Sequence, residues 1–458
     1  MTRKAAVIGK PISHSLSPSI FGFLANRLGV TDLEYTAKEI APEELAQFVE
    51  RFGRELDGVG FNVTIPHKES IIPLLNDTAI EAQAIGAVNV VHRTQKGLKG
   101  YNTDVYGILR TFEKHGVSLA GKNAIIVGAG GAARAVAYAL GMKNAAQVIL
   151  LTPNQERAHA LISAIQPHFK NTRFESCKDW SDLKPEKKSE AWSLIAQSTP
   201  LGMSSQPKTR EGIPASDYFS QLQGLKFNSE AWAFDLIYRP EWTPFLEESK
   251  KQGLLPIGGL NMLIEQALET WRVWFGIKPA AELGDYLRYR PIFLTGFMGA
   301  GKSTIGPLLA RELGWAFVET DQEIVREAGL SIPEIFRLKG EAYFRDIENS
   351  VIQKHAFQPR TVISLGGGSL IHPKTRDLLV KTGRLVLLSA DPETLYHRLK
   401  STSDDRPLLA QLSEEERRRK IESLLKEREP VYNLAAFRVD TTSKTPEQAA
   451  QEIREKLL

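Results

Sequence analysis

The stretch PIFLTGFMGAGKST, residues 291–304, decides how the C-terminal part of the chain folds. Its apolar start, residues 292–294, predicts a buried strand, and a glycine-rich loop then leads into a helical pattern that opens with Lys302. The loop matches G-x-x-x-x-G-K-[ST], with Gly296 and Gly301 as its fixed glycines. Glycines let backbone N–H groups converge on a phosphate, and the N-terminus of the following helix adds a favourable dipole. The stretch therefore predicts a phosphate-binding loop, with an ordinary glycine-rich turn as the alternative.

The same loop predicts contacts to a nucleoside triphosphate and its metal. Lys302 would add positive charge at the β- and γ-phosphates, and the hydroxyl of Ser303 would hold Mg²⁺. The candidate nucleotide-binding residues are Gly299, Ala300, Gly301, Lys302, Ser303 and Thr304.

Length and composition limit the remaining choices. A chain of 458 residues is too long for one ordinary core, so we expect two or three domains. A formal net charge of +4 is small for this length and argues against a dedicated nucleic-acid surface. The single cysteine, Cys177, excludes an internal disulfide and fits a reducing compartment. We see no signal peptide and no run near the roughly 20 apolar residues of a membrane span, so we expect a cytoplasmic protein.

The first hundred residues carry polar side chains at the ends of apolar strand patterns. Strands are predicted at residues 4–8, with Gly9 as the breaker, at 57–66, and at 87–91 with Asn89 inside. Ligands of open α/β sheets bind at the carboxyl ends of strands, and this set suits a small polyhydroxylated carboxylate. The candidates are Ser15, Ser17, Asn62, Thr64, Lys68, Asn89 and Asp104. The alternatives are that the serines only cap a helix and that the lysine and aspartate are solvated surface charges.

A second glycine-rich loop lies between two buried strand patterns, residues 123–127 and 147–151. Its sequence GAGGAARA fits G-x-G-x-x-A, in which the glycines permit a tight turn and a close approach to a pyrophosphate. Strand, loop and helix follow in the required order, so the loop predicts dinucleotide binding. The candidate contacts are Gly128, Ala129, Gly130, Gly131 and Ala132.

The end of the second strand bears on which dinucleotide binds. An NAD site often has an acid there, whereas this chain has Thr152, Pro153 and Asn154, with Arg157 shortly after. A nearby arginine suits a 2′-phosphate, so Thr152, Asn154 and Arg157 are candidate contacts and the pattern favours NADP.

Several motifs in residues 1 to about 280 together resemble shikimate dehydrogenases. They are SLSPS, NVTIPHK, AVNV, GYNTD, GAGGAARA, STPLGM, DLIYRPEWTPF and GGLNMLIEQA. The resemblance implies reduction of 3-dehydroshikimate to shikimate with NADPH, with Lys68 and Asp104 as the catalytic pair. It implies a pocket lined by Ser15, Ser17, Asn62, Thr64, Asn89, Asp104, Tyr238 and Gln266. The family commonly has Asn-Arg-Thr or Asn-Arg-Ser where this chain has Thr152-Pro153-Asn154, which leaves NADP versus NAD open, with Arg157 as a replacement.

The segment after residue 290 resembles shikimate kinases, which phosphorylate the 3-hydroxyl of shikimate with ATP and Mg²⁺. The resemblance implies that shikimate is bound by Asp321, Arg345, Gly367, Gly368 and Arg428. Asp321 would orient the attacking hydroxyl and take its proton, and Arg406 on a lid would reach the transferring phosphoryl group. Glu319 stands where the family often has an aspartate near Mg²⁺.

The expected fold class is α/β throughout. We expect an α/β substrate domain at residues 1–102 and 254–280, a Rossmann-type NADP-binding domain at 103–253, a linker at 281–290 and a P-loop kinase domain with a parallel sheet at 291–458. The partners would be the small-molecule substrates, with no nucleic acid and no membrane, and a homo-oligomer stays open. The alternatives are that only one half is active, that the dehydrogenase oxidises quinate and prefers NAD, or that the chain is a ligand-sensing regulator. A regulator would be expected to lose Lys68, Lys302 or Asp321, and all three are present.

Overall fold

A computed structural model describes residues 2–12, 15–55, 57–183, 191–203, 205–400 and 412–457. The chain forms two compact units, Met1–Arg288 and Tyr289–Leu458, which we call unit 1 and unit 2 and describe separately. Among the helices in these ranges, none combines the length and the apolar character that crossing a bilayer requires.

Unit 1 begins with a six-stranded sheet in the order β2-β1-β3-β5-β6-β4. Its strands are β1 (Arg3–Gly9), β2 (Leu33–Glu39), β3 (Gly58–Val63), β4 (Asp77–Thr78), β5 (Val90–Thr94) and β6 (Gly97–Tyr101). β1 pairs in parallel with β2 and β3, whereas β5 is antiparallel to both β3 and β6. Gly9 does not break β1 as predicted, because it still pairs with Glu39. A Cβ at Gly9 would lie 2.4 Å from the Thr64 side chain and 2.8 Å from the Ile65 carbonyl, so close packing explains the glycine.

A second six-stranded sheet in unit 1 has the order β12-β11-β10-β7-β8-β9 and is parallel throughout. Its strands are β7 (Asn123–Val127), β8 (Gln147–Leu151), β9 (Arg173–Cys177), β10 (Trp192–Gln197), β11 (Phe227–Asp235) and β12 (Leu255–Ile257). β7 and β8 have the predicted bounds. The strand order reverses between β7 and β10, and a ligand is expected at the carboxyl ends of the strands there.

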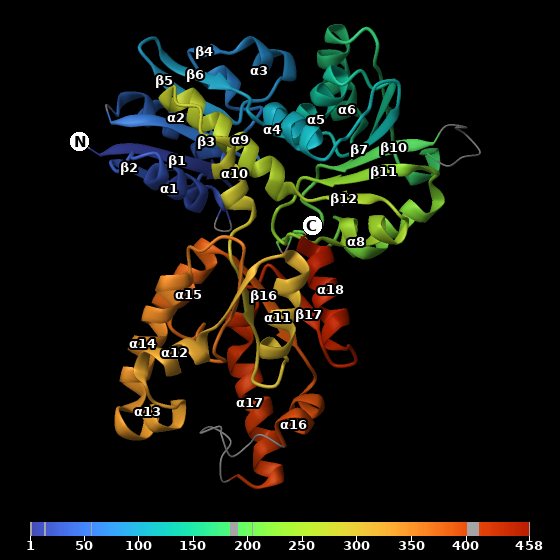
Figure 1. The fold of residues 1–458 in the computed structure, drawn as a ribbon. Helices are drawn as coiled ribbons and strands as arrows, with labels where there is room; N and C mark the ends of the chain where they lie inside the picture. The colour runs from blue at the N-terminus through green and yellow to red at the C-terminus, as the bar shows by residue number, and fades with distance from the viewer. Residues whose placement is uncertain are drawn as a thin grey trace. The chain divides into compact units, whose positions relative to one another are not determined.

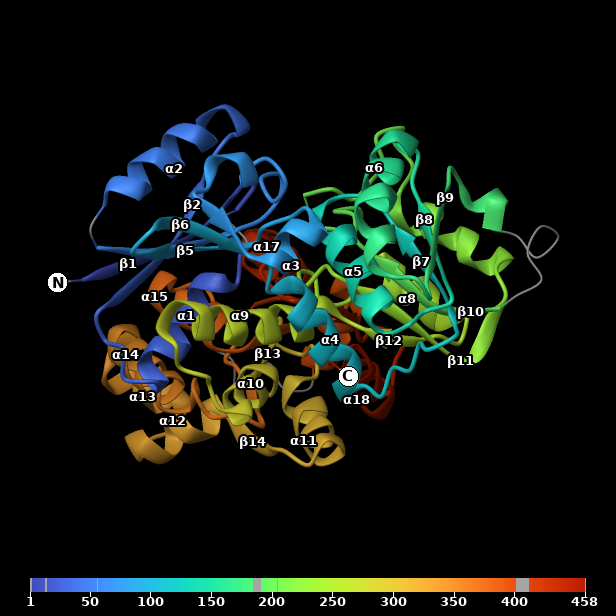
Figure 2. The ribbon, with the colours of Figure 1, turned by 90° about the horizontal axis from the view of Figure 1, so that it is seen from above.

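Three helices connect the two sheets of unit 1. α4 (Asp104–Lys114) packs against α9 (Gly259–Phe275) and α5 (Gly131–Met142), and both ribbon views show them side by side (Figures 1 and 2). Phe112 of α4 packs edge-on against Phe234 of β11, with ring centroids 5.4 Å apart. The other helices of this unit are α1 (Ser17–Arg27), α2 (Leu45–Arg54), α3 (Ile80–Ile85), α6 (Gln155–Ile165), α7 (Ala215–Phe219), α8 (Pro244–Lys251) and α10 (Ala281–Arg288).

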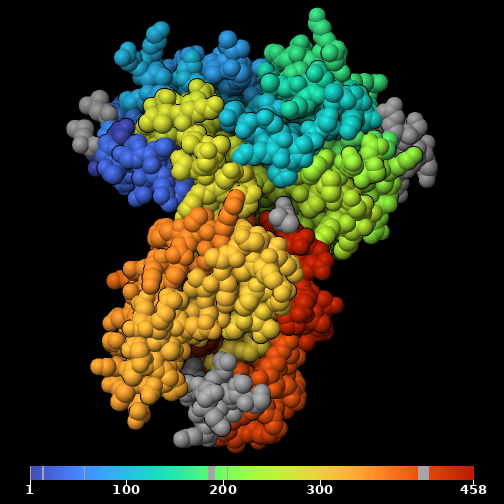
Figure 3. Space-filling model, in the orientation of Figure 1, coloured from blue at the N-terminus to red at the C-terminus, as the bar shows by residue number. Residues whose placement is uncertain are grey.

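The predicted linker is largely helical. α10 covers most of residues 281–290 and packs on α9 and α1. Leu287 is buried, and Tyr286 stacks on Phe23 of α1 with ring centroids 4.5 Å apart. The space-filling view shows the yellow atoms of α9 and α10 against the blue atoms of α1 (Figure 3). The short apolar pattern of this segment is therefore used for packing within unit 1.

Unit 2 contains a five-stranded parallel sheet in the order β14-β15-β13-β16-β17. Its strands are β13 (Ile292–Thr295), β14 (Ala316–Glu319), β15 (Thr361–Ser364), β16 (Arg384–Ser389) and β17 (Phe437–Asp440). Its helices are α11 (Lys302–Leu313), α12 (Thr320–Ala328), α13 (Ile332–Leu338), α14 (Gly340–His355), α15 (Pro373–Thr382), α16 (Pro392–Lys400), α17 (Glu414–Tyr432) and α18 (Pro446–Leu457). α11 and α18 lie side by side (Figure 1), and the central strand β13 leads directly into the phosphate-binding loop and α11.

Candidate active sites

Unit 1 contains a cavity of about 360 Å³ lined by residues of β1 and β3 in the first sheet and by the loops that follow β10 and β11 of the second sheet. Its lining contains the predicted residues Ser15, Ser17, Asn62, Thr64, Lys68, Asn89, Asp104, Ala132, Tyr238 and Gln266. These residues come from positions up to 251 residues apart in the sequence (Ser15 to Gln266). The structure therefore brings the predicted substrate residues of unit 1 together.

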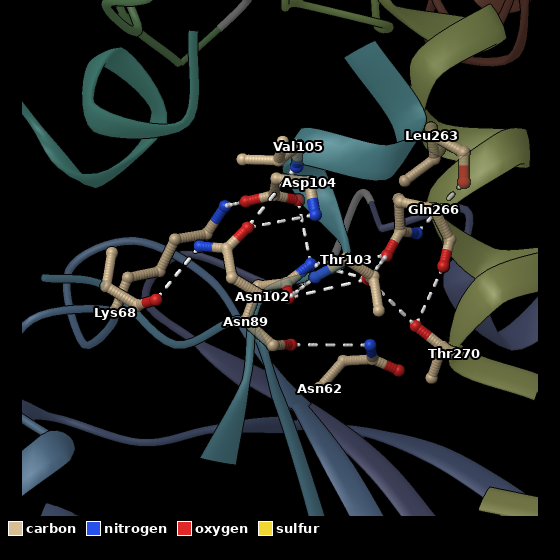
Figure 4. Close-up of polar contacts among 11 residues, drawn as sticks. Asn62, Lys68, Asn89, Asn102, Thr103, Asp104, Val105, Leu263, Gln266 and Thr270 are labelled. Carbon is tan, nitrogen blue, oxygen red and sulfur yellow. Dashed lines mark hydrogen bonds and ion pairs between the residues drawn. The ribbon is translucent and has the colours of Figure 1, made fainter. Parts of the chain in front are cut away.

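Lys68 and Asp104 form an ion pair in this cavity. The Lys68 Nζ donates to Asp104 Oδ2 at 2.5 Å, and the side chains are only 14% and 5% exposed (Figure 4). Asp104 is the first residue of α4, where a carboxylate is favoured by the helix dipole. The Lys68 stem also lies beside the dinucleotide loop, since a Cβ at Gly131 would be 3.0 Å from Lys68 Cβ. The ammonium is thus held between the polar pocket and the predicted dinucleotide site.

Asn89 fixes the second oxygen of Asp104. Its Nδ2 donates to Asp104 Oδ1 at 2.7 Å, and its Oδ1 accepts from the Thr103 amide at 2.7 Å (Figure 4). The prediction that Asn89 lies inside a strand is wrong, because β5 begins only at Val90. The chain bends at Asn89, and the side chain bonds to the start of α4.

Thr103 was missed as a site residue although it lies within the GYNTD motif, next to Asp104. It is buried, and its Oγ1 lies 3.2 Å from Gln266 Oε1, to which it donates, and 3.1 Å from Thr270 Oγ1 (Figure 4). Gln266 in turn donates to the carbonyl of Leu263 at 2.9 Å. Thr103 therefore connects α9 to the residues around the ion pair.

One serine at the start of α1 supports the capping alternative in part. The N-cap residue is Leu16 and makes no side-chain cap, but the Ser15 hydroxyl accepts from the amide of Ser17, the first residue of the helix, at 3.3 Å. Ser17 is buried within the lining of the cavity. Burial also raises the pKa of the Tyr238 hydroxyl, opposed by a hydrogen bond with Ser15, so the phenol keeps its proton. The pocket thus presents neutral hydroxyl groups besides the Lys68–Asp104 pair.

The dinucleotide loop has the backbone form that a pyrophosphate requires. Gly128 has φ +110°, and a Cβ there would lie 2.8 Å from the Ser198 hydroxyl. α5 begins at Gly131, so the helix N-terminus faces the same loop. Asn154 is the N-cap of α6, and its Oδ1 accepts from the Arg157 amide at 2.9 Å. Thr152 Oγ1 accepts from the Asn154 amide at 3.3 Å, so hydrogen bonds within this turn order the residues predicted to contact the adenosine ribose.

Unit 2 contains a cavity of about 510 Å³ at the phosphate-binding loop. Its lining contains the predicted residues Gly299, Ala300, Gly301, Lys302, Ser303, Thr304, Asp321 and Gly367. Gly296 has φ +143°, and a Cβ there would lie 2.2 Å from the Leu388 carbonyl, so only glycine fits. Lys302 Nζ donates to the carbonyls of Gly296 and Phe297 at 2.9 and 3.2 Å, which keeps the ammonium inside the loop. The loop residues therefore fit the phosphates of a nucleotide.

Glu319, at the end of β14, lines the same cavity. Burial raises the pKa of its carboxyl, opposed by hydrogen bonds with Ser364 and Ser303, the first of them at 2.8 Å. Among the residues that the structure describes, no three His, Cys, Asp or Glu side chains group as metal ligands do. Ser303 and Glu319 line the cavity and are candidate Mg²⁺ contacts, which phosphate oxygens and water would complete.

The remaining predicted residues of unit 2 surround the glycine turn after β15. Arg428 Nη1 donates to the Gly367 carbonyl at 2.7 Å, and a Cβ at Gly368 would lie 3.2 Å from the Arg345 guanidinium. A Cβ at Gly366 would lie 3.1 Å from Asp321 Oδ1. Arg406 falls in residues 401–411, outside the described residues.

Glu348 was not predicted as a site residue, although it lies one helical turn after Arg345. It is buried, accepts from Arg345 Nη1 at 2.8 Å, and accepts from the Ser369 hydroxyl at 2.7 Å. Its carboxylate therefore holds the arginine beside the glycine turn.

Comparisons with known proteins agree with this geometry. Residues 298–458 match the family model of shikimate kinase, and residues 7–91 match that of the shikimate dehydrogenase substrate binding domain. The shikimate dehydrogenase (NADP(+)) of Symbiobacterium thermophilum is 36% identical over 274 residues, which cover 60% of this chain and 89% of that protein. The corresponding enzyme of Moorella thermoacetica is 36% identical over 302 residues, covering 66% of this chain and 98% of that protein.

Solved structures give the same assignment for unit 1. Aquifex aeolicus shikimate dehydrogenase has a TM-score of 0.52 at 30% identity and covers 62% of this chain and 97% of its own. The Thermus thermophilus enzyme, solved with NADP(H) and shikimate, has a TM-score of 0.51 at 32% identity and covers 62% and 98%. These matches confirm the predicted α/β fold class and both resemblances found in the sequence. The chain belongs to the shikimate dehydrogenase family, carries a shikimate kinase domain in its C-terminal unit, and is a bifunctional enzyme of the shikimate pathway.

Proposed function

We propose that unit 1 reduces 3-dehydroshikimate to shikimate with NADPH, and that unit 2 phosphorylates shikimate with ATP and Mg²⁺. The product of the first reaction is then the substrate of the second. The observation that carries the proposal is the position of Lys68, whose Nζ bonds to Asp104 in the pocket while its stem lies against Gly131 of the dinucleotide loop. At this position the Lys68 ammonium, which can act as a proton donor, would lie between the ketone of a bound substrate and the nicotinamide of a bound cofactor.

Lys68 and Asp104 are the catalytic pair of the reduction in this proposal. NADPH, when bound, supplies the hydride to the carbonyl carbon. Negative charge then develops on the carbonyl oxygen, which Lys68 Nζ stabilises and protonates. Asp104, held by Asn89, orients the ammonium, and in the reverse direction the pair removes the hydroxyl proton.

The other pocket residues hold the substrate. The hydroxyl and amide groups of Ser15, Ser17, Asn62, Thr64, Asn89, Tyr238 and Gln266 line one cavity with the ion pair. Neutral donors of this kind suit the carboxylate and hydroxyls of a small cyclic acid. In domain terms, residues 1–102 and 254–280 form the substrate domain, residues 103–253 the NADP-binding domain, and residues 291–458 the kinase domain.

The proposed cofactor is NADP(H). The backbone of Gly128, Ala129, Gly130, Gly131 and Ala132 holds the pyrophosphate, and Thr152 and Asn154 lie at the ribose. Arg157, in the first turn of α6, holds the 2′-phosphate in place of the missing family arginine. The NADP(+) names of both quoted relatives support this choice.

In unit 2, Asp321 orients the 3-hydroxyl of shikimate and takes its proton. Arg345 and Arg428 bind the carboxylate, and Gly367 and Gly368 allow its close approach. The residues Gly299, Ala300, Gly301, Lys302, Ser303 and Thr304 hold the phosphates, and Ser303 also holds Mg²⁺. Arg406 neutralises charge on the transferring phosphoryl group.

The test is made on the intact protein with 3-dehydroshikimate, NADPH and MgATP, followed by mass spectrometry of the products. Shikimate 3-phosphate is the expected product. Shikimate alone would contradict the kinase half, and no reduction with NADPH but reduction with NADH would favour the NAD-preferring alternative. Binding of substrates without turnover in either half would favour the ligand-sensing regulator.

A further inference from the structure

Glu69, the residue after Lys68, connects the substrate-binding part of unit 1 to two arginines of the dinucleotide-binding part. Its carboxylate accepts from Arg134 Nε at 3.3 Å and also pairs with the guanidinium of Arg157. Arg134 lies on α5, and Arg157 lies on α6. One carboxylate next to the catalytic lysine therefore contacts both helices that follow the cofactor-binding strands.

The two arginines are held differently. The Arg134 side chain is 9% exposed, and its Nη1 also donates to the carbonyl of Ile85 at 3.4 Å. The Arg157 side chain is 49% exposed. Exposed ion pairs contribute little free energy, so Arg157 can exchange its partner at low cost, whereas Arg134 stays in place.

The guanidinium of Arg157 lies beside the dinucleotide loop. A Cβ at Gly130 would lie 3.9 Å from Arg157 Nη2. Arg157 is also in the first turn after β8, the strand whose end faces the adenosine ribose in folds of this type. The Glu69 carboxylate therefore forms an ion pair with an arginine that lies where the 2′-phosphate of NADP(H) is expected to bind.

We infer that Glu69 is a specificity-determining residue, because its carboxylate competes with the 2′-phosphate of NADP(H) for Arg157. The inference rests on the proposed role of Arg157. Binding of NADP(H) moves Arg157 from Glu69 to the phosphate, while Arg134 keeps Glu69 in place. NAD(H) has no phosphate at this position and leaves the pair intact. Glu69 therefore reduces the preference for NADP(H) over NAD(H) that Arg157 provides.

The experiment measures dissociation constants of NADPH and NADH by nicotinamide fluorescence in the full-length protein, comparing wild type, Glu69→Gln, Arg157→Ala and the double variant. The glutamine keeps an oxygen that accepts from Arg134, which favours normal folding. We expect Glu69→Gln to lower the dissociation constant of NADPH about threefold, the size of a lost exposed ion pair. The dissociation constant of NADH should not change. In the Arg157→Ala background the same substitution is expected to leave the ratio of the two constants unchanged.

A matched control is Glu113→Gln, which removes another surface carboxylate paired with an arginine, Arg110, and is expected to change neither constant. If Glu69→Gln weakens the binding of NADPH and of NADH equally, with or without Arg157, the inference is overturned. Glu69 then only holds the substrate-binding and dinucleotide-binding parts of unit 1 together. If Arg157→Ala leaves the ratio unchanged, the proposed role of Arg157 fails, and the inference fails with it. If Arg157→Ala lowers the preference for NADPH but Glu69→Gln does not raise it, the inference alone fails.

Discussion

Lys68 and Asp104 lie 36 residues apart in the sequence, yet their side chains meet at 2.5 Å in a nearly buried ion pair. Asp104 Oδ2 is bonded to the lysine, and Oδ1 is bonded to Asn89 at 2.7 Å. Both oxygens of the carboxylate are therefore committed before any substrate arrives. The pair is preorganised, so the position of the Lys68 ammonium depends on α4, whose first residue is Asp104.

A substitution in one proposed active site is expected to lower only the activity of that site. Lys68→Ala should lower kcat of the reduction by about 10²- to 10⁴-fold, the usual contribution of a general acid, and leave phosphorylation unchanged. Lys302→Ala should do the reverse, because Lys302 lies in the phosphate-binding loop of unit 2. Each activity is measured separately on both variants, with the exposed Lys122→Ala as control. Loss of both activities from one substitution would contradict independent sites.

Thr103→Val should impair the dehydrogenase through the network around Gln266. The substitution keeps the size of the side chain but removes the bonds of Thr103 Oγ1 to Gln266, Thr270 and Asn89. We expect kcat/KM for 3-dehydroshikimate to fall about tenfold, with a loss of stability of about 1–2 kcal/mol.

The control for Thr103, the N-cap residue of α4, is Thr111→Val within that helix. Thr111 is buried too, but its hydroxyl donates to the carbonyl of Gly107 within the helix, at 2.8 Å, and not to the residues around the ion pair. It should cost similar stability without the kinetic effect, and equal kinetic losses in both variants would mean that Thr103 acts only through folding.

Glu319→Gln should weaken the use of Mg²⁺ by the kinase. We expect the Mg²⁺ concentration for half-maximal phosphorylation to rise at least about tenfold, while reduction of 3-dehydroshikimate is unchanged. Since burial raises the pKa of Glu319, its ionised form is lost at a higher pH than for an ordinary glutamate. The half-maximal Mg²⁺ concentration of the wild type should therefore rise on acidification.

Glu327→Gln serves as the control for Glu319, because it removes a carboxylate of α12 that pairs with Lys354 of α14. An unchanged Mg²⁺ requirement in Glu319→Gln would exclude Glu319 from the metal site.

Asp235 should make unit 1 less stable as the pH rises. Burial raises the pKa of its carboxyl to about 7, opposed by hydrogen bonds from Thr243 and from the Ile237 amide. Between pH 4 and 7 the folded state holds a proton that the unfolded state lacks, so the free energy of unfolding falls as the pH rises. Relative to Asp235→Asn, the wild type should lose about 2–3 kcal/mol between pH 5 and pH 8.

Urea unfolding followed by tryptophan fluorescence measures this, since of the tryptophans only Trp315 lies outside unit 1. The exposed Asp217→Asn serves as control and should follow the wild type. Parallel pH profiles of the wild type and Asp235→Asn would show that Asp235 is ionised in the folded state at both pH values.

The sequence predicted the elements whose pattern is set by local burial. β7 and β8 are buried strands of a parallel sheet, so their apolar runs are continuous and their bounds are clear. Residues 281–290 have the sequence pattern of a linker, because the few apolar residues of α10 acquire a partner only when α1 and α9 are assembled. The apolar pattern around Asn89 predicts a strand, because the contact of Asn89 with Thr103 is not part of that local pattern.

The site residues that could be predicted from the sequence are likewise those that a local pattern identifies. Lys68, Asp104 and Lys302 lie in motifs with a recognisable spacing, and they were predicted. Glu69 was missed, because its partners Arg134 and Arg157 are 65 and 88 residues away and meet it only when α5 and α6 assemble with the segment that follows β3. No spacing rule in a single sequence reports such a contact.

The end of α10 determines where the two activities can be separated. Arg288 bonds to Asn261 at 2.6 Å and to Glu265 at 3.1 Å within unit 1, whereas the carbonyl of Tyr289 already accepts from the Arg360 amide in unit 2. Consecutive residues thus belong to different folding units, and the border is a single peptide bond. A dehydrogenase polypeptide that stopped at residue 280 would uncover the apolar surface beneath Leu287 and remove a cationic partner of Glu265. A separate dehydrogenase polypeptide is therefore expected to need all of α10, with its last residue no earlier than Arg288.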